Sequence, residues 1–275
     1  MIHVVTDSCV DLPAHLLKQY NIRVVPLSIR VNGKEFMEGV NITPREFYRE
    51  MAASVQLPQT SQPTPAQFAN VFKELAGKGK VLCLTISSKL SGSYGSAVLG
   101  KEIAGNSNVT VFDTLAASIG QGLQVIKAAQ LINSGLSLEH VLEFLHKMRE
   151  EMKFIILLDT LENIVKGGRL SKFQGSIAKL LNIKVILHNV KGSVEVLEKV
   201  RGKNKSLQRV IDLLGERCED FSSKIIGITH VDNLEDAEHL AQEIKVRYQP
   251  QDVLVHEMGA TISTYAGKAG LIVAF

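Results

Sequence analysis

Apolar runs of strand length alternate with amphipathic stretches through the first half of this chain. The runs are apolar almost without interruption, whereas the stretches between them carry apolar residues at helical spacing. Strands that alternate with helices in this way predict a parallel sheet flanked by helices. The expected strands are IHVVTDS, IRVVPLSIRV, KVLCLTIS and NVTVFDT, and the expected helices are DLPAHLLKQY, TPREFYREMAAS, PAQFANVFKELAG, AVLGKEIAG and QGLQVIKAAQLINS.

Short local signals add detail to this half. Thr43 and Thr64 are each followed by a proline and, three positions on, by Glu or Gln, which is the pattern of a capped helix start. Asn32-Gly33 is typical of a type I′ turn. We therefore expect two helices with capping boxes and a small antiparallel hairpin near residues 24–40.

The pattern changes after a helix that ends near residue 152, and we place a domain boundary there, between 1–152 and 153–275. The second half has a hairpin signal at Lys191-Gly192, and a hairpin beside other strands indicates a mixed sheet. The predicted fold class is α/β, with a parallel sheet in the N-terminal domain and a mixed sheet in the C-terminal α/β domain. The helices expected in the second half are 172–182, 205–218 and 234–248.

Composition places the chain among globular proteins. Its 275 residues are 45% hydrophobic and 21% charged, which is enough apolar material for two ordinary domains. The net charge of +3 is small for a polyanion-binding protein, so nucleic acid is not an expected partner. The apolar runs fall far short of the roughly 20 residues of a membrane helix, so we expect no stable membrane insertion.

Cysteine usage indicates a reducing compartment. Cys9, Cys83 and Cys218 are far apart, odd in number and without a Cys-x-x-Cys pair, which fits neither a disulfide framework nor a zinc site. The first residues also lack the basic and apolar regions of a signal peptide. We therefore expect a cytoplasmic protein.

Three clusters of Ser and Thr stand beside predicted helices. The richest, SSKLSGSYGSA, interleaves serines with Gly92 and Gly95, so that one oxyanion can receive several hydrogen bonds. The second is Thr60-Ser61 in QTSQPTP, and the third is GATISTY near the C-terminus. Such hydroxyls are ordinarily caps, but three clusters of one chemistry suggest one anion site. No nucleophile elbow accompanies them, so we do not expect catalysis by this chain.

Three aspartates form an alternative candidate site. Asp7, Asp113 and Asp159 each end a predicted strand, in VVTDS, TVFDT and LLDT. Ligands of parallel sheets lie beyond the carboxyl ends of the strands, so these residues suggest a metal-dependent enzyme that transfers a phosphoryl group on a small substrate. Aspartate at a strand end also caps the helix that follows. Both interpretations stay open at the level of sequence.

Basic residues gather in two short stretches, one around a glycine pair and one after the hairpin. The ordinary interpretation is a solvated surface, and the functional one is an anion site or a docking patch, for which arginine offers a bidentate fork. An adaptor without a small ligand is therefore a third hypothesis. The basic residues are Lys166, Arg169 and Lys172 in the first stretch, and Lys199, Arg201, Lys203, Lys205 and Arg209 in the second.

Seven motifs, taken in order, resemble the DegV family of bacterial lipid-binding proteins. They are TDSCVDLP, TSQPTPAQF, SGSYGSA, FDTLAASIGQG, LDTLENIVKGGRLSK, EKVRGKNK and GATISTYAGKAGLIVAF, and they run over nearly the whole chain. The resemblance implies two α/β domains with a long-chain fatty acid between them. It also implies a carrier that is not an enzyme, needs no cofactor, and presents the carboxylate of its lipid to a fatty acid kinase that makes an acyl phosphate.

The same resemblance implies roles for individual residues. Arg169 and Arg201 are similar in position to arginines that face the phosphate or the kinase, and no metal ligand is implied. The residues implied to bind the fatty-acid carboxylate are Thr60, Ser61, Ser91, Gly92, Ser93 and Tyr265.

One position departs from the family's pattern. Where the family typically has a histidine beside the carboxylate, this chain has Tyr265. A phenol can donate a hydrogen bond to a carboxylate, but it cannot become a cation near neutral pH as imidazole can. We therefore expect carboxylate binding to tolerate this exchange better than transfer to a kinase does.

Overall fold

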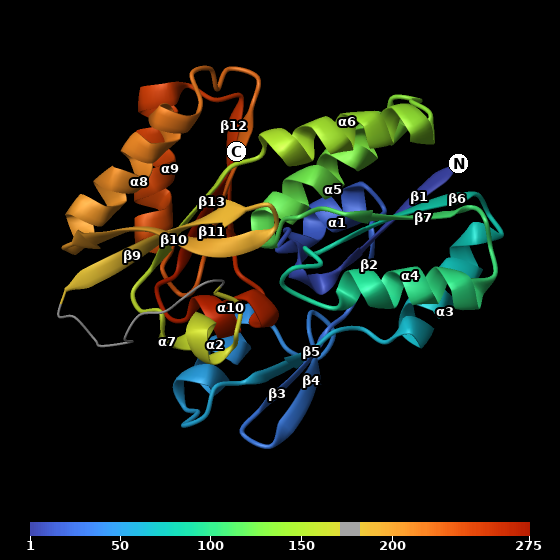
Figure 1. Ribbon diagram of the computed structural model, residues 1–275, viewed down its shortest axis with the longest axis horizontal. Helices are drawn as coiled ribbons and strands as arrows, with labels where there is room; N and C mark the ends of the chain where they lie inside the picture. Colours follow the sequence, from blue (N-terminus) through green and yellow to red (C-terminus); the bar gives the residue numbers. More distant parts are fainter. Residues whose placement is uncertain (171–181) are drawn as a thin grey trace.

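The computed structural model describes residues 1–170 and 182–275, in which two large β-sheets stand side by side above a small third sheet (Figure 1). The first large sheet has the order β2-β1-β6-β7, and all of its neighbouring strands are parallel. This is the parallel sheet that the alternating pattern predicted. Its strands are β1 (Ile2–Asp7), β2 (Arg23–Val25), β6 (Lys80–Thr85) and β7 (Val109–Asp113).

Helices cover both faces of this sheet because successive strand residues point to opposite sides. Cys83 packs with Phe68 and Phe72 on one face, whereas Leu82 joins a larger core on the other. Cys83 is fully buried. The helices of this half are η1 (Ser8–Val10), α1 (Ala14–Gln19), α2 (Pro44–Ala52), α3 (Pro65–Ala76), α4 (Ser93–Ala104), α5 (Ser118–Asn133) and α6 (Leu138–Glu151).

Both predicted capping boxes are confirmed. The Thr43 hydroxyl accepts a hydrogen bond from the backbone N–H of Glu46, and the Glu46 carboxylate accepts one from the backbone N–H of Thr43. Thr64 and Gln67 are paired in the same way at the start of α3. These reciprocal bonds satisfy N–H groups that have no partner inside a helix.

The run IRVVPLSIRV, expected as one strand, forms two strands in different sheets. Pro26 lies between them, and proline has no N–H to donate to a ladder, so the chain leaves the large sheet there. The hairpin predicted at Asn32-Gly33 is confirmed, with φ angles of 51° and 75° at the two turn residues. The small sheet consists of β3 (Ser28–Val31), β4 (Lys34–Met37) and β5 (Gln59–Ser61), in the order β4-β3-β5.

The second large sheet is mixed, as predicted, with the order β10-β9-β8-β13-β11-β12. The hairpin of β9 and β10 is antiparallel, whereas β11 and β12 are parallel. The change of sheet between α6 and β8 falls where we placed the domain boundary, which stays a prediction. The strands are β8 (Phe154–Leu158), β9 (Ile183–Val190), β10 (Ser193–Arg201), β11 (Ile225–His230), β12 (Asp252–Glu257) and β13 (Leu271–Ala274).

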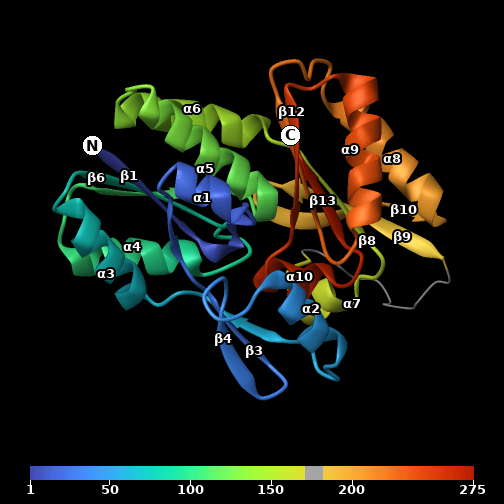
Figure 2. The same ribbon diagram turned by 180° about the vertical axis from the view of Figure 1, so that it is seen from behind.

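Two long helices, α8 (Lys203–Arg217) and α9 (Leu234–Tyr248), cover the outer face of the mixed sheet, as Figure 2 shows from behind. The helix expected at 234–248 is confirmed, the one at 205–218 begins two residues earlier, and 172–181 lies outside the described residues. Two short helices, α7 (Glu162–Lys166) and α10 (Ala260–Ala266), lie near the small sheet (Figure 1).

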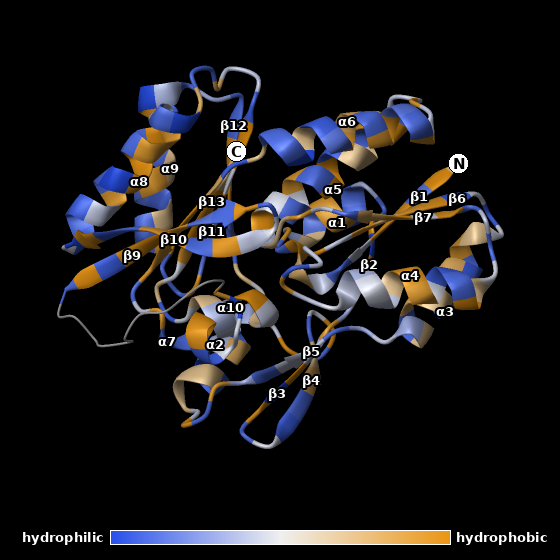
Figure 3. Ribbon diagram, in the orientation of Figure 1, coloured by the Kyte–Doolittle hydropathy of each residue, from blue (hydrophilic) through white to orange (hydrophobic). Residues whose placement is uncertain are grey.

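The inner face of the mixed sheet joins the core of the first half. Leu158 and Ile272 belong to the same buried cluster as Leu82 and Leu123. Figure 3 shows the apolar strands inside and the polar faces of α6, α8 and α9 outside. Within the described parts of the chain, no helix combines the length and apolarity that a bilayer crossing requires.

Candidate functional site

A cavity of about 310 Å³ lies where α7, α10 and β5 meet the two large sheets. Its walls come from both halves of the chain and are mostly apolar, with a few polar groups, which is the usual make-up of a small-molecule site. The apolar lining residues are Leu27, Ile86, Leu90, Ala117, Ile156, Leu158, Ile164, Val194, Ile262, Ala266 and Ile272. The polar ones are Thr60, Ser61, Gln62, Ser91, Arg169, Thr261 and Tyr265.

The three hydroxyl clusters found in the sequence all reach this cavity. Thr60 and Ser61 come from β5, Ser91 precedes α4, and Thr261 and Tyr265 come from α10. Because β5 pairs with β3 rather than with a strand of either large sheet, it carries its hydroxyls to the gap between them. Their roles toward a carboxylate stay a prediction.

The serine-rich loop is shorter than expected because α4 begins at Ser93, four residues before the predicted start. The backbone N–H of Ser93 donates to Ser91 Oγ at 3.2 Å, and the two hydroxyl oxygens are 3.0 Å apart. Ser93 is fully buried and Ser91 is partly buried. Of Ser91 and Ser93, only Ser91 lines the cavity. Ser93 lies outside the lining and forms a hydrogen bond to Ser91.

Gln62 was not among the site residues predicted from the sequence. This residue lines the cavity, and its Nε2 donates to Ser96 Oγ at 3.2 Å. A Cβ atom at Gly92 would lie 2.3 Å from Gln62 Oε1, so the predicted site residue Gly92 acts by leaving room for the amide. The one sequence feature that could have indicated Gln62 is its place in QTSQPTP, directly after the predicted site residues Thr60 and Ser61.

Tyr265 contacts two other polar residues of the cavity lining, Thr60 and Arg169. Its hydroxyl is 2.6 Å from Thr60 Oγ1, which links α10 to β5. The Arg169 guanidinium lies over the Tyr265 ring, 4.8 Å from its centroid. A Cβ atom at Gly167 would lie 2.4 Å from that ring, so the glycine pair after α7 admits the stacked tyrosine.

The two predicted arginines occupy different places. Arg169 lines the cavity and donates from Nε to Leu90 O at 3.2 Å and from Nη1 to Gly167 O at 2.5 Å. Among the described residues that line the cavity, it is the only basic side chain. Arg201 is exposed at the end of β10 and does not line the cavity.

The three strand-end aspartates do not form one site. Asp7 is fully buried and accepts hydrogen bonds from the backbone N–H of Cys9 and of Ile86, and Asp113 accepts them from two loop N–H groups. Asp159 directly follows β8 of the other large sheet and pairs with Lys184. Within residues 1–170 and 182–275, no group of three His, Cys, Asp or Glu is placed to hold a metal ion. Asp7 and Asp113 are equivalent in that each accepts from the N–H two positions on and from an N–H of the loop after β6, whereas Asp159 forms an ion pair in the other sheet, so the expected equivalence of all three was wrong.

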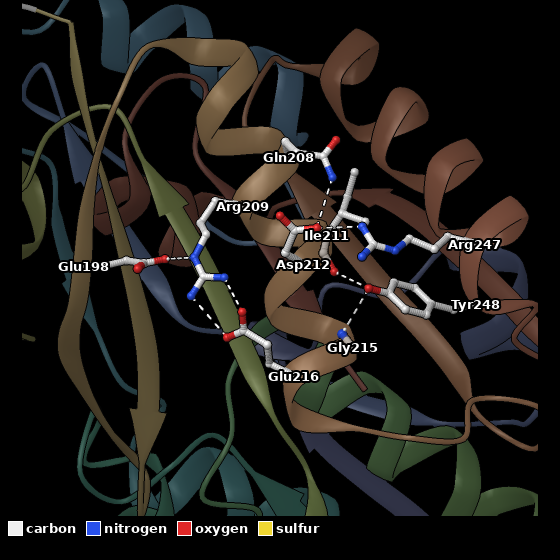
Figure 4. Close-up of polar contacts among 9 residues, drawn as sticks. All are labelled: Glu198, Gln208, Arg209, Ile211, Asp212, Gly215, Glu216, Arg247 and Tyr248. Carbon is white, nitrogen blue, oxygen red and sulfur yellow. Dashed lines mark hydrogen bonds and ion pairs between the residues drawn. The ribbon is translucent and has the colours of Figure 1, made fainter.

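Two of the five basic residues after the hairpin, Lys203 and Arg209, form ion pairs at the surface, and Figure 4 shows those of Arg209. Arg209 bonds to Glu198 and Glu216, while Arg247 and Gln208 both donate to Asp212. Lys203 pairs with Asp236. Lys166 of the first stretch pairs with Glu162, and Lys172 lies outside the described residues. For Lys166, Lys203 and Arg209, these pairs favour the solvated-surface interpretation over a docking patch for anions.

Two buried carboxylates stand behind the cavity wall. Burial raises the pKa of the Asp11 carboxyl well above its usual range, although the hydrogen bond from Ser118 lowers it, and the nearby Glu38 charge adds to the rise. Burial likewise raises the pKa of Glu38, against hydrogen bonds from Ser8 and Thr261 that lower it. The folded protein therefore binds protons at both groups more readily than the unfolded chain does.

Asp11→Asn is expected to stabilise the protein at pH 8. A raised folded-state pKa means that Asp11 stabilises the fold below its ordinary value of 3.8 and loses this contribution as the pH rises through the raised value. Asparagine keeps an acceptor for Gly259 and removes the buried charge. We expect Tm to rise by about 2–4 °C at pH 8, the effect of about 1 kcal/mol in a chain of this size, with a smaller difference at pH 5.

Asp220→Asn is the matched control for this calorimetric comparison. Asp220 is exposed, and the hydrogen bond from the Ser222 backbone lowers its pKa, so its contribution has the opposite sign. This variant should not gain stability at pH 8. A Tm below that of the wild type for Asp11→Asn at pH 8 contradicts the expectation.

Comparison with known proteins gives one consistent answer. A family model described as "Uncharacterised protein, DegV family" matches residues 1–275. A DegV domain-containing protein of Caldanaerobacter subterraneus subsp. tengcongensis is 33% identical over 267 residues, which cover 97% of this chain and 95% of that protein.

Solved structures agree with this family match. One described as fatty acid binding of a DegV family protein from Thermus thermophilus has a TM-score of 0.93 and 34% identity, and covers 100% of this chain and 99% of its own. The Streptococcus pneumoniae Fatty Acid Kinase B3 protein, loaded with linoleic acid, has a TM-score of 0.87 and 27% identity, with coverage of 100% and 99%.

Proposed function

Because this chain belongs to the DegV family, we propose that it binds a long-chain fatty acid in the cavity beside α10, between the two large sheets. The observation that carries this proposal is an apolar cavity with its hydroxyls and one guanidinium gathered from β5, the Ser91 loop, α7 and α10. The Thermus thermophilus relative, described as fatty acid binding, supports the same ligand class.

The acyl chain supplies most of the affinity in this proposal. At roughly 0.8 kcal/mol per buried methylene, a long chain gives a gross gain on the order of 10 kcal/mol before the costs of association. Ile156, Leu158 and Ile272, from two neighbouring strands of the mixed sheet, offer the apolar wall for that chain. An unpaired carboxylate would oppose this gain, so its hydrogen bonds decide whether an acid can be bound.

The head group is assigned to the polar end of the cavity. The hydroxyl of Ser91 and one hydroxyl of the hydrogen-bonded Thr60–Tyr265 pair can donate to a carboxylate, and Arg169 adds a positive charge. The guanidinium stacked on Tyr265 thereby supplies the charge that a phenol lacks. In this proposal Arg169 meets the head group directly, and Arg201 faces a partner at the surface.

The fate of the bound acid is the finer part of the proposal. The chain acts as a carrier and not as an enzyme, and it presents the carboxylate to a fatty acid kinase in the cytoplasm. Similarity to the kinase-system B3 protein supports this partner, and three free cysteines support a reducing compartment. Residues 1–152 and 153–275 are proposed as the two domains that enclose the lipid.

A comparison of an acid with an alcohol of the same length tests the proposed function. Lipid-stripped protein is titrated with palmitate and with hexadecanol, and binding is followed by calorimetry. Both ligands bury the same tail, whereas only palmitate engages the charge of Arg169. We expect palmitate to bind at least about 10-fold more tightly, since charge-assisted hydrogen bonds contribute about 1.5–3 kcal/mol. No saturable binding of palmitate contradicts the proposal.

Ser93→Ala is expected to weaken lipid retention by about three- to ten-fold, because one hydrogen bond of about 1 kcal/mol that holds Ser91 is lost. Arg201→Ala should leave retention unchanged and reduce only phosphorylation by a kinase, since its side chain is exposed outside the cavity. Palmitate release is measured for both variants. Equal acceleration of release in the two variants refutes this division of roles.

A further inference from the structure

The segment 257–261 leads from β12 into α10, and side chains of the N-terminal half form hydrogen bonds to four of its five residues. The N-terminal side chains in these contacts are Asp11, which follows η1, Glu38, which follows β4, and Arg45 and Tyr48 of α2, and all lie more than 200 positions away in the sequence. The contacts are Arg45 with Glu257, Tyr48 with Met258, Asp11 with Gly259, and Glu38 with Thr261.

Glu38 connects two walls of the cavity. Its side chain is almost fully buried, and its carboxylate accepts hydrogen bonds from Thr261 N at 2.8 Å, Thr261 Oγ1 at 2.7 Å and Ser8 Oγ at 2.6 Å. The Ser8 hydroxyl oxygen in turn accepts from Leu27 N at 3.0 Å. Because Leu27 and Thr261 both line the cavity, one carboxylate fixes their relative positions.

Asp11 holds the residue just before α10. Its Oδ1 accepts from Gly259 N at 2.8 Å, and its Oδ2 accepts from Ser118 Oγ at 2.5 Å. A Cβ atom at Gly259 would lie 2.5 Å from Glu38 Oε1 and 2.8 Å from Asp11 Oδ1. Both carboxylates therefore converge on one backbone position that only glycine leaves open.

We propose that Asp11 and Glu38 are positioning residues for the lipid cavity, an inference that rests on the proposed function. They fix the first turn of α10, and Tyr265 follows Thr261 by four residues on the same helical face. The placement of the Tyr265 hydroxyl opposite Thr60 thus depends on two carboxylates that do not line the cavity themselves.

The test measures how fast bound palmitate leaves. The protein is loaded with palmitate that carries an isotopic label at its carboxyl carbon, release is followed during a chase with unlabelled palmitate, and the NMR resonance of the bound carboxyl is recorded. Glu38→Ala should release palmitate about 10-fold faster, equivalent to about 1.4 kcal/mol, and should shift the carboxyl resonance. Glu143→Ala, at an exposed site on α6, is the matched control and should change neither quantity.

The conservative variant separates positioning from general stability. Glu38→Gln keeps an acceptor for the Thr261 N–H, and its amide can donate to the two hydroxyls, so release should return to within about three-fold of the wild type. Release from Glu38→Gln that is as fast as from Glu38→Ala overturns the proposal. A Glu38→Ala variant that releases palmitate at the wild-type rate and leaves the carboxyl resonance unchanged also overturns the proposal.

Gly259→Ala gives an independent test if Glu38→Ala does not fold. The added methyl group displaces both carboxylates without removing either charge, so faster release is expected, whereas Gly77→Ala, where a Cβ meets open space, should behave as the wild type. Unchanged release in Gly259→Ala overturns the proposal. Failure of the wild type to bind palmitate at all would refute the proposed function instead, so the two failures are distinguishable.

Discussion

Replacing Arg169 by Ala is expected to weaken palmitate binding by about 10- to 150-fold, the equivalent of about 1.5–3 kcal/mol for charge-assisted hydrogen bonds. Arg169 is the only basic side chain among the described residues that line the cavity, and its two hydrogen bonds go to uncharged carbonyl groups. Its charge therefore has no acidic partner among the described residues in contact with it, and a ligand carboxylate can supply one. Titration calorimetry with palmitate measures the loss.

The preference for acid over alcohol separates charge recognition from a collapsed cavity. Arg169→Ala should reduce the affinity for hexadecanol much less than that for palmitate, because the apolar wall is unchanged. Arg169→Lys should lie between the alanine variant and the wild type, since lysine keeps the charge but loses the planar fork and the stacking on Tyr265. Equal losses for acid and alcohol in Arg169→Ala contradict the assignment.

Ala117→Phe is expected to remove most of the bound lipid. Ala117 is partly exposed on the cavity wall, and its extended backbone, with φ of −148°, accepts any side chain. A ring that displaces about three methylenes of the ligand costs about 2.4 kcal/mol of burial, or about 50-fold in Kd. Lipid content per chain, measured after extraction of the purified variant, reports the effect.

The same substitution on the surface provides the control. Ala66 is exposed on α3 and does not line the cavity, so Ala66→Phe should keep the wild-type lipid content. Full lipid content in a folded Ala117→Phe variant would place the ligand elsewhere. A chain that is shorter by a few methylenes is expected to bind this variant better than palmitate does, because the ring shortens the available space.

Local signals predicted much of the fold. The capping boxes at Thr43 and Thr64 and the turn at Asn32-Gly33 depend on neighbours within a few residues, so the sequence carries them in full. The split at Pro26 was also visible as a proline inside an apolar run, but the length of that run favoured one strand. The pairing of β5 with β3 is long-range, and the three residues of β5 are too few to show a strand pattern in the sequence.

The candidate site was harder to predict from the sequence than the fold, because its residues come together only in the folded chain. The three hydroxyl clusters were found by their shared chemistry, but the direction in which Arg169 points depends on its stacking against α10. Asp11 and Glu38 were missed altogether. Their partners at Gly259 and Thr261 lie 248 and 223 positions away, and a single acid between apolar neighbours, as in CVDLP and FMEGV, gives no sign of the partner that it will meet.

Native mass spectrometry of the protein as purified shows whether the chain carries a fatty acid. We expect a complex of one chain with one fatty acid. Palmitate labelled at its carboxyl carbon should replace the bound fatty acid and appear at the same stoichiometry. Ala117→Phe, measured beside it, should appear mainly as the free chain. A wild-type protein that carries no lipid, and that takes up none when palmitate is added, contradicts the proposed lipid-binding function.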